Sequence, residues 1–227
     1  MRHNNNALIV FAKQPIAGKV KTRLTTVLSP EEAAELYRCM LIDTLSKVKQ
    51  LEGVDIYLFF EGNGDAASYF ATIAAGMETV PQRGNNLGER MMDAFQRTFE
   101  HGYESVAIIG TDSPDLPVGF LDVAFQRLEK NGVDVVIGPT EDGGYYLLAM
   151  KRVYCRLFRD VPWSSDQVLN LSLARGAEAG ITIGLLPGWY DVDTVEDLRR
   201  PGLLDKGSGA PMTREFIKKL PPFSIPA

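Results

Sequence analysis

Short apolar runs alternate with longer amphipathic segments along this chain. The runs are rich in aliphatic, β-branched and aromatic residues, which is typical of buried strands, and the segments between them repeat apolar residues with helical spacing. The predicted strands are residues 7–12, 55–60, 77–80, 105–110, 134–137, 145–150 and 181–186. The predicted helices are residues 30–51, 65–75, 87–99, 117–130, 165–179 and 194–200. Strands that alternate with helices predict a mostly parallel α/β sheet covered on both faces.

Two helix starts carry local signals. Ser29, Pro30 and Glu32 form a capping-box sequence with proline at the first helical position. Ser164 or Ser165 is expected to cap the helix that runs to about residue 179.

Composition predicts one domain with a sizeable core, because 45% of the 227 residues are hydrophobic. Residues 1–200 are expected to form that domain. Residues 201–227, rich in proline and glycine, are expected to be a tail packed over its surface. Cys39 and Cys155 lack metal-ligand spacing, and Cys39 is expected to be a buried structural thiol.

Charge and hydropathy narrow the class of protein. The formal net charge of −5 argues against broad nucleic-acid binding. No apolar run approaches the roughly 18 residues of a membrane span, and no signal-peptide pattern is present. We therefore expect a cytoplasmic protein without a membrane span.

A basic loop directly follows the first predicted strand. Lys13, Lys19, Lys21 and Arg23 lie within eleven residues, and Gly18 permits a close approach of the backbone. Lysine and arginine heads together with turn amides can hold a di- or triphosphate. The P-loop and dinucleotide-binding glycine patterns are both absent. The alternative is an ordinary solvated basic turn.

Two aspartates follow the apolar strand in the sequence VAIIGTDSPDL. Asp112 lies at the carboxyl end of that strand, where open α/β sheets bind ligands. A carboxylate at that edge suits Mg²⁺, which shares its ligands with water and substrate phosphates. Asp115 is better placed to cap the helix that starts at Pro117.

A second acidic pair occurs near the end of the predicted domain. Asp191 and Asp193 alternate, so in extended backbone they face the same side, and either one could complete a metal site. The alternative for Asp193 is a cap on the helix begun by Thr194.

Two glycine-containing loops are further candidates. Asp142 precedes Gly143 and Gly144 in a turn between strands, where it could bond an acceptor hydroxyl or serve only the turn. The polar segment from Gln82 to Arg90 contains two glycines and precedes a helix, whose free amides favour anions, although an ordinary connecting loop is an equal alternative.

One aromatic residue is also a candidate. Trp163 precedes a predicted helix, and its ring could stack on a base or a sugar. Burial in the core is the alternative.

The chain resembles a known family at several strings in family order: FAKQPIAGKVKTRL, QRGNNLGERM, GTDSPDLP, GPTEDGGYYLLAM, VPWSS and DVDTVEDL. They resemble the DUF2064 family, also described as rSAM/selenodomain-associated transferase 1 and as glycosyltransferase-A-like. The family is similar to the guanylyltransferase that acts on 2-phospholactate. The resemblance implies an α/β, three-layer α/β/α nucleotide-diphospho-sugar transferase (GT-A, Rossmann-like) fold with a mixed, mostly parallel sheet.

The resemblance also implies a donor nucleotide over the basic loop and a metal at Asp112, together with Asp191 or Asp193. Two departures leave the base and the acceptor open. Ala17-Gly18-Lys19 replaces the glycine-rich loop of sugar nucleotidyltransferases, and Asp112 and Asp115 are spaced D-x-x-D where many glycosyltransferases have D-x-D.

Together these patterns predict a metal-dependent transferase that uses a nucleotide donor and a small-molecule acceptor, by either glycosyl or nucleotidyl transfer. Asp112 and Asp142 are the expected catalytic residues, and Asp112, Asp191 and Asp193 the expected ligands of Mg²⁺ or Mn²⁺. The expected nucleotide-binding residues are Ala12, Lys13, Gly18, Lys19, Lys21, Arg23, Gln82, Gly84 and Leu87. The alternative is a nucleotide-binding sensor or partner protein without turnover, because no general base is obvious.

Overall fold

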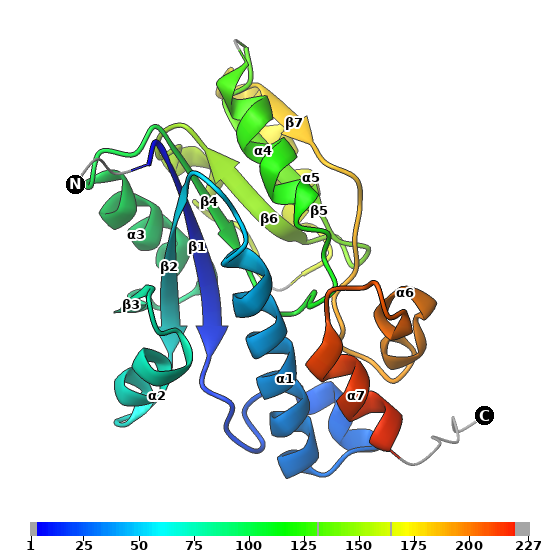
Figure 1. Ribbon diagram of the computed structural model, residues 1–227. Helices are drawn as coiled ribbons and strands as arrows, with labels where there is room; N and C mark the ends of the chain where they lie inside the picture. Colours follow the sequence, from blue (N-terminus) through cyan, green and yellow to red (C-terminus); the bar gives the residue numbers. More distant parts are fainter. Residues whose placement is uncertain (1–3, 131, 164, 221–227) are drawn as a thin grey trace.

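A seven-stranded sheet runs through the molecule in the order β3-β2-β1-β4-β6-β5-β7 (Figure 1). The computed structural model describes residues 4–130, 132–163 and 165–220. Strand β6 is antiparallel to both of its neighbours, β4 and β5, and the other paired strands are parallel. The strands are β1 (Asn6–Lys13), β2 (Val54–Glu61), β3 (Glu78–Pro81), β4 (Ser105–Ile109), β5 (Val135–Pro139), β6 (Tyr145–Met150) and β7 (Ile183–Leu185).

Helices connect the strands at the predicted places, with ends that differ by a few residues. The capping box is confirmed, because the Glu32 amide donates to Ser29 Oγ at 3.1 Å and the Ser29 amide donates to Glu32 Oε2 at 2.7 Å. The α-helices are α1 (Pro30–Val48), α2 (Ala66–Ile73), α3 (Leu87–Phe99), α4 (Gly119–Glu129), α5 (Val168–Glu178), α6 (Pro201–Leu204) and α7 (Pro211–Lys219). The short 3₁₀ helices are η1 (Thr22–Thr26), η2 (Cys155–Leu157) and η3 (Asp197–Arg199).

Alternation along the strands builds two cores, one on each face of the sheet. In β1, Leu8 and Val10 pack with residues of α1, α2 and α4, whereas Ala7 and Ile9 pack with residues of α3. Leu169 of α5 packs against that second core. The result is a three-layer α/β/α arrangement, in agreement with the period-two pattern of the sequence.

The described part of residues 201–227 packs against α1, and it forms the helices α6 and α7 where an irregular tail was expected (Figure 1). Asp43, in the middle of α1, accepts hydrogen bonds from the backbone amides of Met212 (3.0 Å) and Thr213 (2.7 Å). The Thr213 hydroxyl donates to the same carboxylate at 2.7 Å. A buried carboxylate thereby satisfies two amides of the first turn of α7 and fixes that helix against α1.

Two other helix starts differ from the prediction. α5 begins at Val168, and Ser165 accepts only a long bond, 3.4 Å, from the Gln167 amide; Ser164 lies outside the described residues. The helix expected over residues 194–200 is only the 3₁₀ turn η3, because the Asp197 carboxylate accepts the amides of Asp193 and Thr194 and holds this stretch in a turn.

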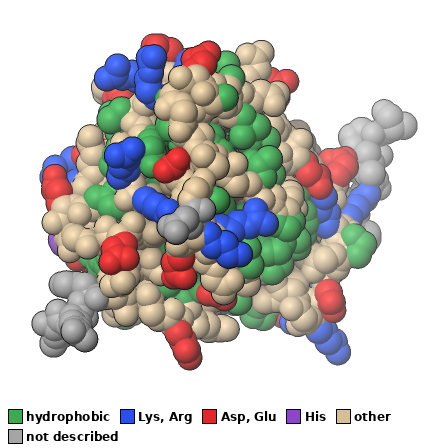
Figure 2. All heavy atoms as spheres, turned by 90° about the horizontal axis from the view of Figure 1, so that it is seen from above, with side chains coloured by type: hydrophobic (Ala, Val, Ile, Leu, Met, Phe, Trp, Pro, Cys, Tyr) green, Lys and Arg blue, Asp and Glu red, His purple; other side chains and the backbone are tan. Residues whose placement is uncertain are grey.

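The remaining observations concern membrane-spanning helices, the surface charge and Cys39. In the described part of the chain, no helix is both long and apolar enough to cross a membrane. Figure 2 shows the molecule from above, from the edge at which β1 begins, and there positive, negative and hydrophobic side chains are interspersed. Cys39 is buried as expected, and burial raises the pKa of its thiol to about 11.

Candidate functional site

A cleft of about 910 Å³ lies at the edge where β1 and β4 end. This is the edge at which open α/β sheets bind their ligands. Gly18 and Gly84 are not among the residues that line the cleft. The predicted residues that do line it are Ala12, Lys13, Lys19, Lys21, Arg23, Gln82, Leu87, Asp112, Asp142, Asp191 and Asp193.

The basic loop is anchored by buried residues and exposes its other charges. Val20 and Leu24 are buried, 4% and 0% exposed, whereas Lys19 and Arg23 between and beside them are exposed. The exposed fraction of the Arg23 side chain is 73%. This alternation explains how one short segment can both stay fixed and offer cations to a ligand in the cleft. Gly18 has a φ of +73°, so glycine suits its backbone conformation.

Lys21 differs from its expected role as an exposed phosphate-binding cation. Its side chain is only 3% exposed, and Nζ donates to Oδ1 of Asp112 and, at 2.9 Å, to Oδ1 of Asp193. Burial alone would lower the pKa of Lys21, but the two carboxylates raise it well above its ordinary value. In this conformation the ammonium therefore neutralises the acidic side of the cleft.

The pKa values of Asp112 and Asp191, which both line the cleft, are shifted in opposite directions. Burial would raise the pKa of Asp112, but the Lys21 ammonium holds it below its ordinary value. Burial, reinforced by the negative charge of Asp112, raises the pKa of Asp191 to about 7, although Ser113 Oγ donates to its Oδ1 at 2.8 Å. One carboxylate of the pair is therefore firmly ionised and the other is only partly ionised near neutral pH.

Asp115 and Asp193 do not cap helices, so the cap predicted for Asp115 is wrong and the alternative of a cap at Asp193 is excluded. Asp115 is buried and accepts hydrogen bonds from the Tyr190 hydroxyl and, at 3.3 Å, from Trp189 Nε1; α4 starts only at Gly119. The Asp193 carboxylate is instead paired with Lys21. These partners are 75, 74 and 172 positions away in sequence, so local helix signals could not identify them.

The turn that carries Asp142 is structurally constrained. Asp142 Oδ1 accepts hydrogen bonds from Thr140 Oγ1 (2.6 Å) and from the Gly144 amide (3.1 Å), so the turn-stabilising role is present. Gly143 has a φ of +88°, and a Cβ there would come within 2.2 Å of the Asp166 carbonyl oxygen. Glycine is therefore required at this position for both backbone conformation and space.

The loop before α3 lines the opposite side of the cleft. Gln82 Nε2 donates to the Phe59 carbonyl at 3.0 Å, which fixes the side-chain amide at the end of β2. Asn86 caps α3 by accepting from the Glu89 amide, which leaves fewer free amides for an anion than the sequence suggested. Leu87 is 42% exposed beside this cap.

Trp163 packs against other aromatic rings at the side of the cleft. Its ring stacks on Phe158 at 6.4 Å and contacts Tyr145 edge-on at 6.4 Å, and a Cβ on Gly88 would come within 2.2 Å of its indole nitrogen. The ring is thus part of the packing, while it also lines the cleft.

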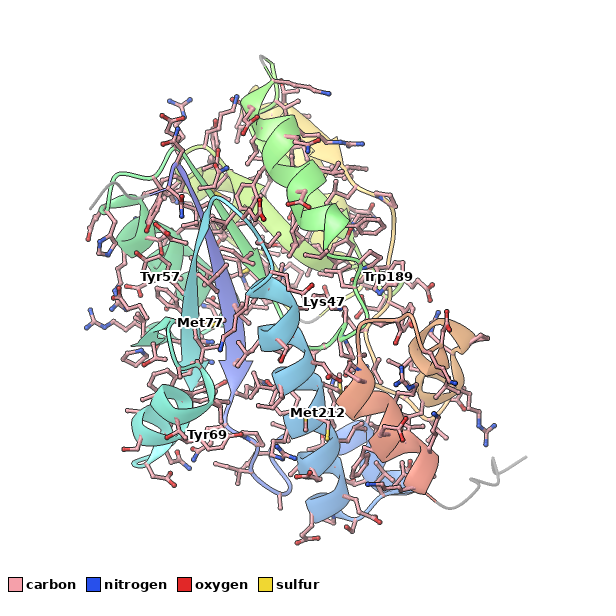
Figure 3. The ribbon with its side chains drawn as sticks, viewed as in Figure 1. Lys47, Tyr57, Tyr69, Met77, Trp189 and Met212 are labelled. Carbon is pink, nitrogen blue, oxygen red and sulfur yellow. The ribbon has the colours of Figure 1, made fainter. Side chains whose placement is uncertain are left out.

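Two residues of α1 that the sequence did not single out bond the end of β1 and the loop after β4. The Tyr37 hydroxyl accepts from the Lys13 amide at 2.9 Å and shares a 2.8 Å hydrogen bond with Thr111 Oγ1. Lys47, labelled in Figure 3, extends from α1 and donates to the carbonyls of Pro114 and, at 2.8 Å, of Leu116. Burial lowers the pKa of Lys47 to about 8. Both residues belong to α1, and neither lies in one of the motifs that indicated the site.

Arg200 is a third residue that sequence reasoning missed. Its guanidinium bonds both carboxylate oxygens of Glu141, at 2.6 and 3.2 Å, and its Nε donates to Asp197 at 3.1 Å. It also lies 4.1 Å above the Tyr190 ring. Arg200 therefore joins the turn that carries Asp142 to the segment that follows Asp193.

The carboxylates fit a metal that is shared with a substrate. Among the described residues, no group of three or more His, Cys, Asp or Glu side chains is arranged to hold a metal ion. Mg²⁺, however, is commonly held by one or two carboxylates, with water and substrate phosphates completing its coordination. Asp112 and Asp191 can supply these two, and burial together with the negative charge of Asp112 raises the pKa of Asp191.

Comparisons with known proteins give a consistent result. The family model described as "Uncharacterized protein conserved in bacteria (DUF2064)" matches residues 44–165. A structure from Desulfovibrio desulfuricans G20, described as a putative nucleotide-diphospho-sugar transferase, is 31% identical, with a TM-score of 0.85. That alignment covers 96% of this chain and 98% of the other.

More distant similarities are to nucleotidyltransferases. A 2-phospho-L-lactate guanylyltransferase of Methanothermobacter thermautotrophicus is 28% identical over 209 residues, which is 88% of this chain and 85% of that protein. A cytidylyltransferase structure from Leptospira borgpetersenii is 15% identical, covers 99% of this chain and 100% of the other, and has a TM-score of 0.61, which supports the fold alone. The expected α/β fold of the nucleotide-diphospho-sugar transferase type is confirmed, and the homologues support an enzyme of the nucleotidyltransferase class. The chain belongs to the DUF2064 family.

Proposed function

We propose that this protein is a metal-dependent nucleotidyltransferase. It would transfer a nucleoside monophosphate from a nucleoside triphosphate to a small anionic acceptor and release pyrophosphate. The observation that carries the proposal is the composition of the cleft, in which the exposed cations Lys13, Lys19 and Arg23 face the carboxylates Asp112 and Asp191. The names of the homologues support nucleotidyl transfer.

The donor would lie across the two charged sides. Lys19 and Arg23 would bind the β- and γ-phosphates and stabilise the charge that develops on the pyrophosphate as it leaves. Asp112 and Asp191 would hold Mg²⁺ or Mn²⁺, which neutralises phosphate charge when it is bound. Gln82 and Leu87, on the far side of the cleft, would contact the nucleoside.

An anionic acceptor fits a cleft in which no histidine is found among the described residues that line it. Of the two histidines, His101 packs against Tyr57 at 5.8 Å and Tyr103 at 6.5 Å, away from the cleft, and His3 lies outside the described residues. A phosphate or carboxylate oxygen is already deprotonated at neutral pH and needs no base. It would form a bond to the α-phosphorus as the bond between the α-phosphorus and the bridging oxygen breaks, and the electron pair would leave with pyrophosphate. The phospho group of 2-phospho-L-lactate, named for the homologues, is an acceptor of this kind.

Asp142 would orient the acceptor from the opposite turn. Its Oδ1 is used by the turn itself, so its role would be to hold the acceptor through the second oxygen. This arrangement would hold donor and acceptor in fixed positions, and positioning would supply much of the rate.

Product analysis tests the proposal. The protein would be incubated with GTP, CTP, ATP or UTP, with Mg²⁺ or Mn²⁺, and with small phosphorylated or carboxylated acceptors, and released pyrophosphate would be measured. Pyrophosphate that forms only with acceptor, and not with the Asp112→Asn variant, supports nucleotidyl transfer. Release of a nucleoside diphosphate from a nucleotide-sugar would instead indicate glycosyl transfer. A raised melting temperature with nucleotide but no product from either donor class would indicate a binding protein without turnover.

A further inference from the structure

We infer that Lys21 is a resident cation that excludes divalent metal from the nucleotide-free cleft, so that metal binds only together with a nucleotide. This inference rests on the proposed function, which places a metal ion at Asp112 and Asp191. It assigns Lys21 a role different from that of the exposed cations in the same loop.

The contacts of Lys21 are those of a bound cation. Its Nζ donates to Asp112 and Asp193, which belong to two segments far apart in sequence. The Lys21 side chain is 3% exposed, whereas the side chains of Asp112 and Asp193 are 47% and 38% exposed. The ammonium therefore lies beneath the carboxylates and binds them from the protein side, and the carboxylates themselves face the cleft.

The local backbone holds Lys21 in this place. Its φ and ψ are 49° and 40°, a left-handed conformation that is uncommon for a residue with a side chain. The flanking residue Val20 packs with Ala34 and Tyr37 of α1, and the Leu24 amide donates to the Lys21 carbonyl at 2.9 Å. The loop thus directs this lysine inward, while its neighbours Lys19 and Arg23 remain at the surface.

Charge and geometry together explain the exclusion. A divalent ion that bound Asp112 would have to approach an ammonium that already bonds the same carboxylate. The ammonium and the ion are both positive, and like charges this close repel strongly in a partly buried site. A nucleoside triphosphate brings several negative charges, which offset this repulsion and supply oxygen ligands of their own. Metal and nucleotide should therefore bind as a pair.

The experiment is a calorimetric titration of Mn²⁺ into nucleotide-free protein. Wild type should bind Mn²⁺ weakly, whereas Lys21→Met should bind it about tenfold more tightly or better. Lys21→Gln is the second variant, because its amide can still donate to a carboxylate and preserve the loop after the charge is lost. Lys19→Gln is the matched control, since it removes the same charge from the same loop without touching either aspartate, and it should bind Mn²⁺ as wild type does.

Three results would overturn the inference. The first is that neither Lys21 variant binds Mn²⁺ more tightly than wild type. The second is that the Lys19 control gains as much affinity as the Lys21 variants do. The third is that nucleotide-free wild type already binds Mn²⁺ as tightly as it does with nucleotide. The same titration with the α,β-methylene analogues of GTP, CTP, ATP and UTP, tested separately, separates this failure from that of the proposed function. If wild type binds Mn²⁺ with one of the analogues while the Lys21 variants gain nothing in its absence, only the inference fails. If wild type binds no Mn²⁺ with any of the four analogues, the proposed metal-dependent function fails.

Discussion

Asp191→Asn should make the protein more stable, and increasingly so as the pH rises. Asp191 is mostly buried beside the ionised Asp112, and its pKa is raised from an ordinary value of 3.8 to about 7. The folded protein therefore holds this proton more tightly than the unfolded chain does. The resulting contribution to stability is fully present below about pH 3.8 and is lost as the pH rises through about 7.

The magnitude follows from the two pKa values. They lie about three pH units apart, and each unit corresponds to about 1.4 kcal/mol, so ionised Asp191 costs about 4 kcal/mol of unfolding free energy above pH 8. At pH 5 the cost is already about 1.5 kcal/mol, because the unfolded carboxyl has lost most of its proton there. The carboxamide of asparagine is neutral throughout and can still accept the Ser113 hydroxyl proton. The advantage of the variant should therefore grow by about 2–3 kcal/mol between pH 5 and pH 8.

Urea unfolding in the presence of EDTA, at several pH values between 5 and 8, measures this difference without bound metal. Asp122→Asn, which changes an exposed aspartate on α4, is the control and should show a small difference from wild type that varies little with pH. An advantage of Asp191→Asn that stays constant over this range, or falls with pH, would refute the reasoning. The gain in stability should be accompanied by weaker binding of Mn²⁺ with nucleotide, as is common when strained functional groups are replaced.

Three further predictions concern the rest of the cleft. Lys19→Ala and Arg23→Ala should each weaken nucleotide binding by about 1–3 kcal/mol, the scale of a lost charged hydrogen bond, and unchanged calorimetric affinity in both would remove the loop from the site. Asp142→Ala should lower the melting temperature, because two turn bonds are lost, while nucleotide affinity stays within about 0.5 kcal/mol; a large loss of affinity would contradict its placement on the acceptor side. Arg200→Gln should speed amide hydrogen exchange in the turn over residues 140–145, because it removes the ion pair with Glu141. Arg38→Gln, which breaks an ion pair on α1 away from the cleft, is the control and should leave this exchange unchanged. Equal exchange in the two variants would contradict the role of Arg200 in holding the turn.

The elements were predictable from sequence because their signals are local. The apolar run of β1, the capping box at Ser29 and the amphipathic pattern of α3 each lie within a few residues. α3 occupies the predicted residues 87–99 without any shift. The prediction of a parallel sheet with helices on both faces needed only the alternation of strands and helices.

The sequence could predict which residues line the candidate site, but not which of them bond to one another. Strand ends and loops indicated which residues gather at one edge of the sheet, but charge alone could not say that Lys21 turns inward while Lys19 and Arg23 stay exposed. The partners of Lys21 lie 91 and 172 positions away, and such pairing depends on the folded chain. The role of Asp115 was missed for the same reason, because its partners come from the segment after β7.

The hydrogen bonds between Asp43 and the start of α7 determine how far this chain can be shortened from its C-terminal side. Asp43 is 2% exposed and is satisfied by the last described helix of the protein, more than 160 positions away. A fragment that stopped at residue 200 would keep every strand, yet it would leave this carboxylate in an apolar wall without its donors. It would also uncover Leu36 and Met40 of α1, which pack with Leu203 and Ala210 in a core cluster of their own. The segment after residue 200 thus covers part of α1, and we expect a fragment that ends at residue 200 to be less stable than one that extends to the end of α7.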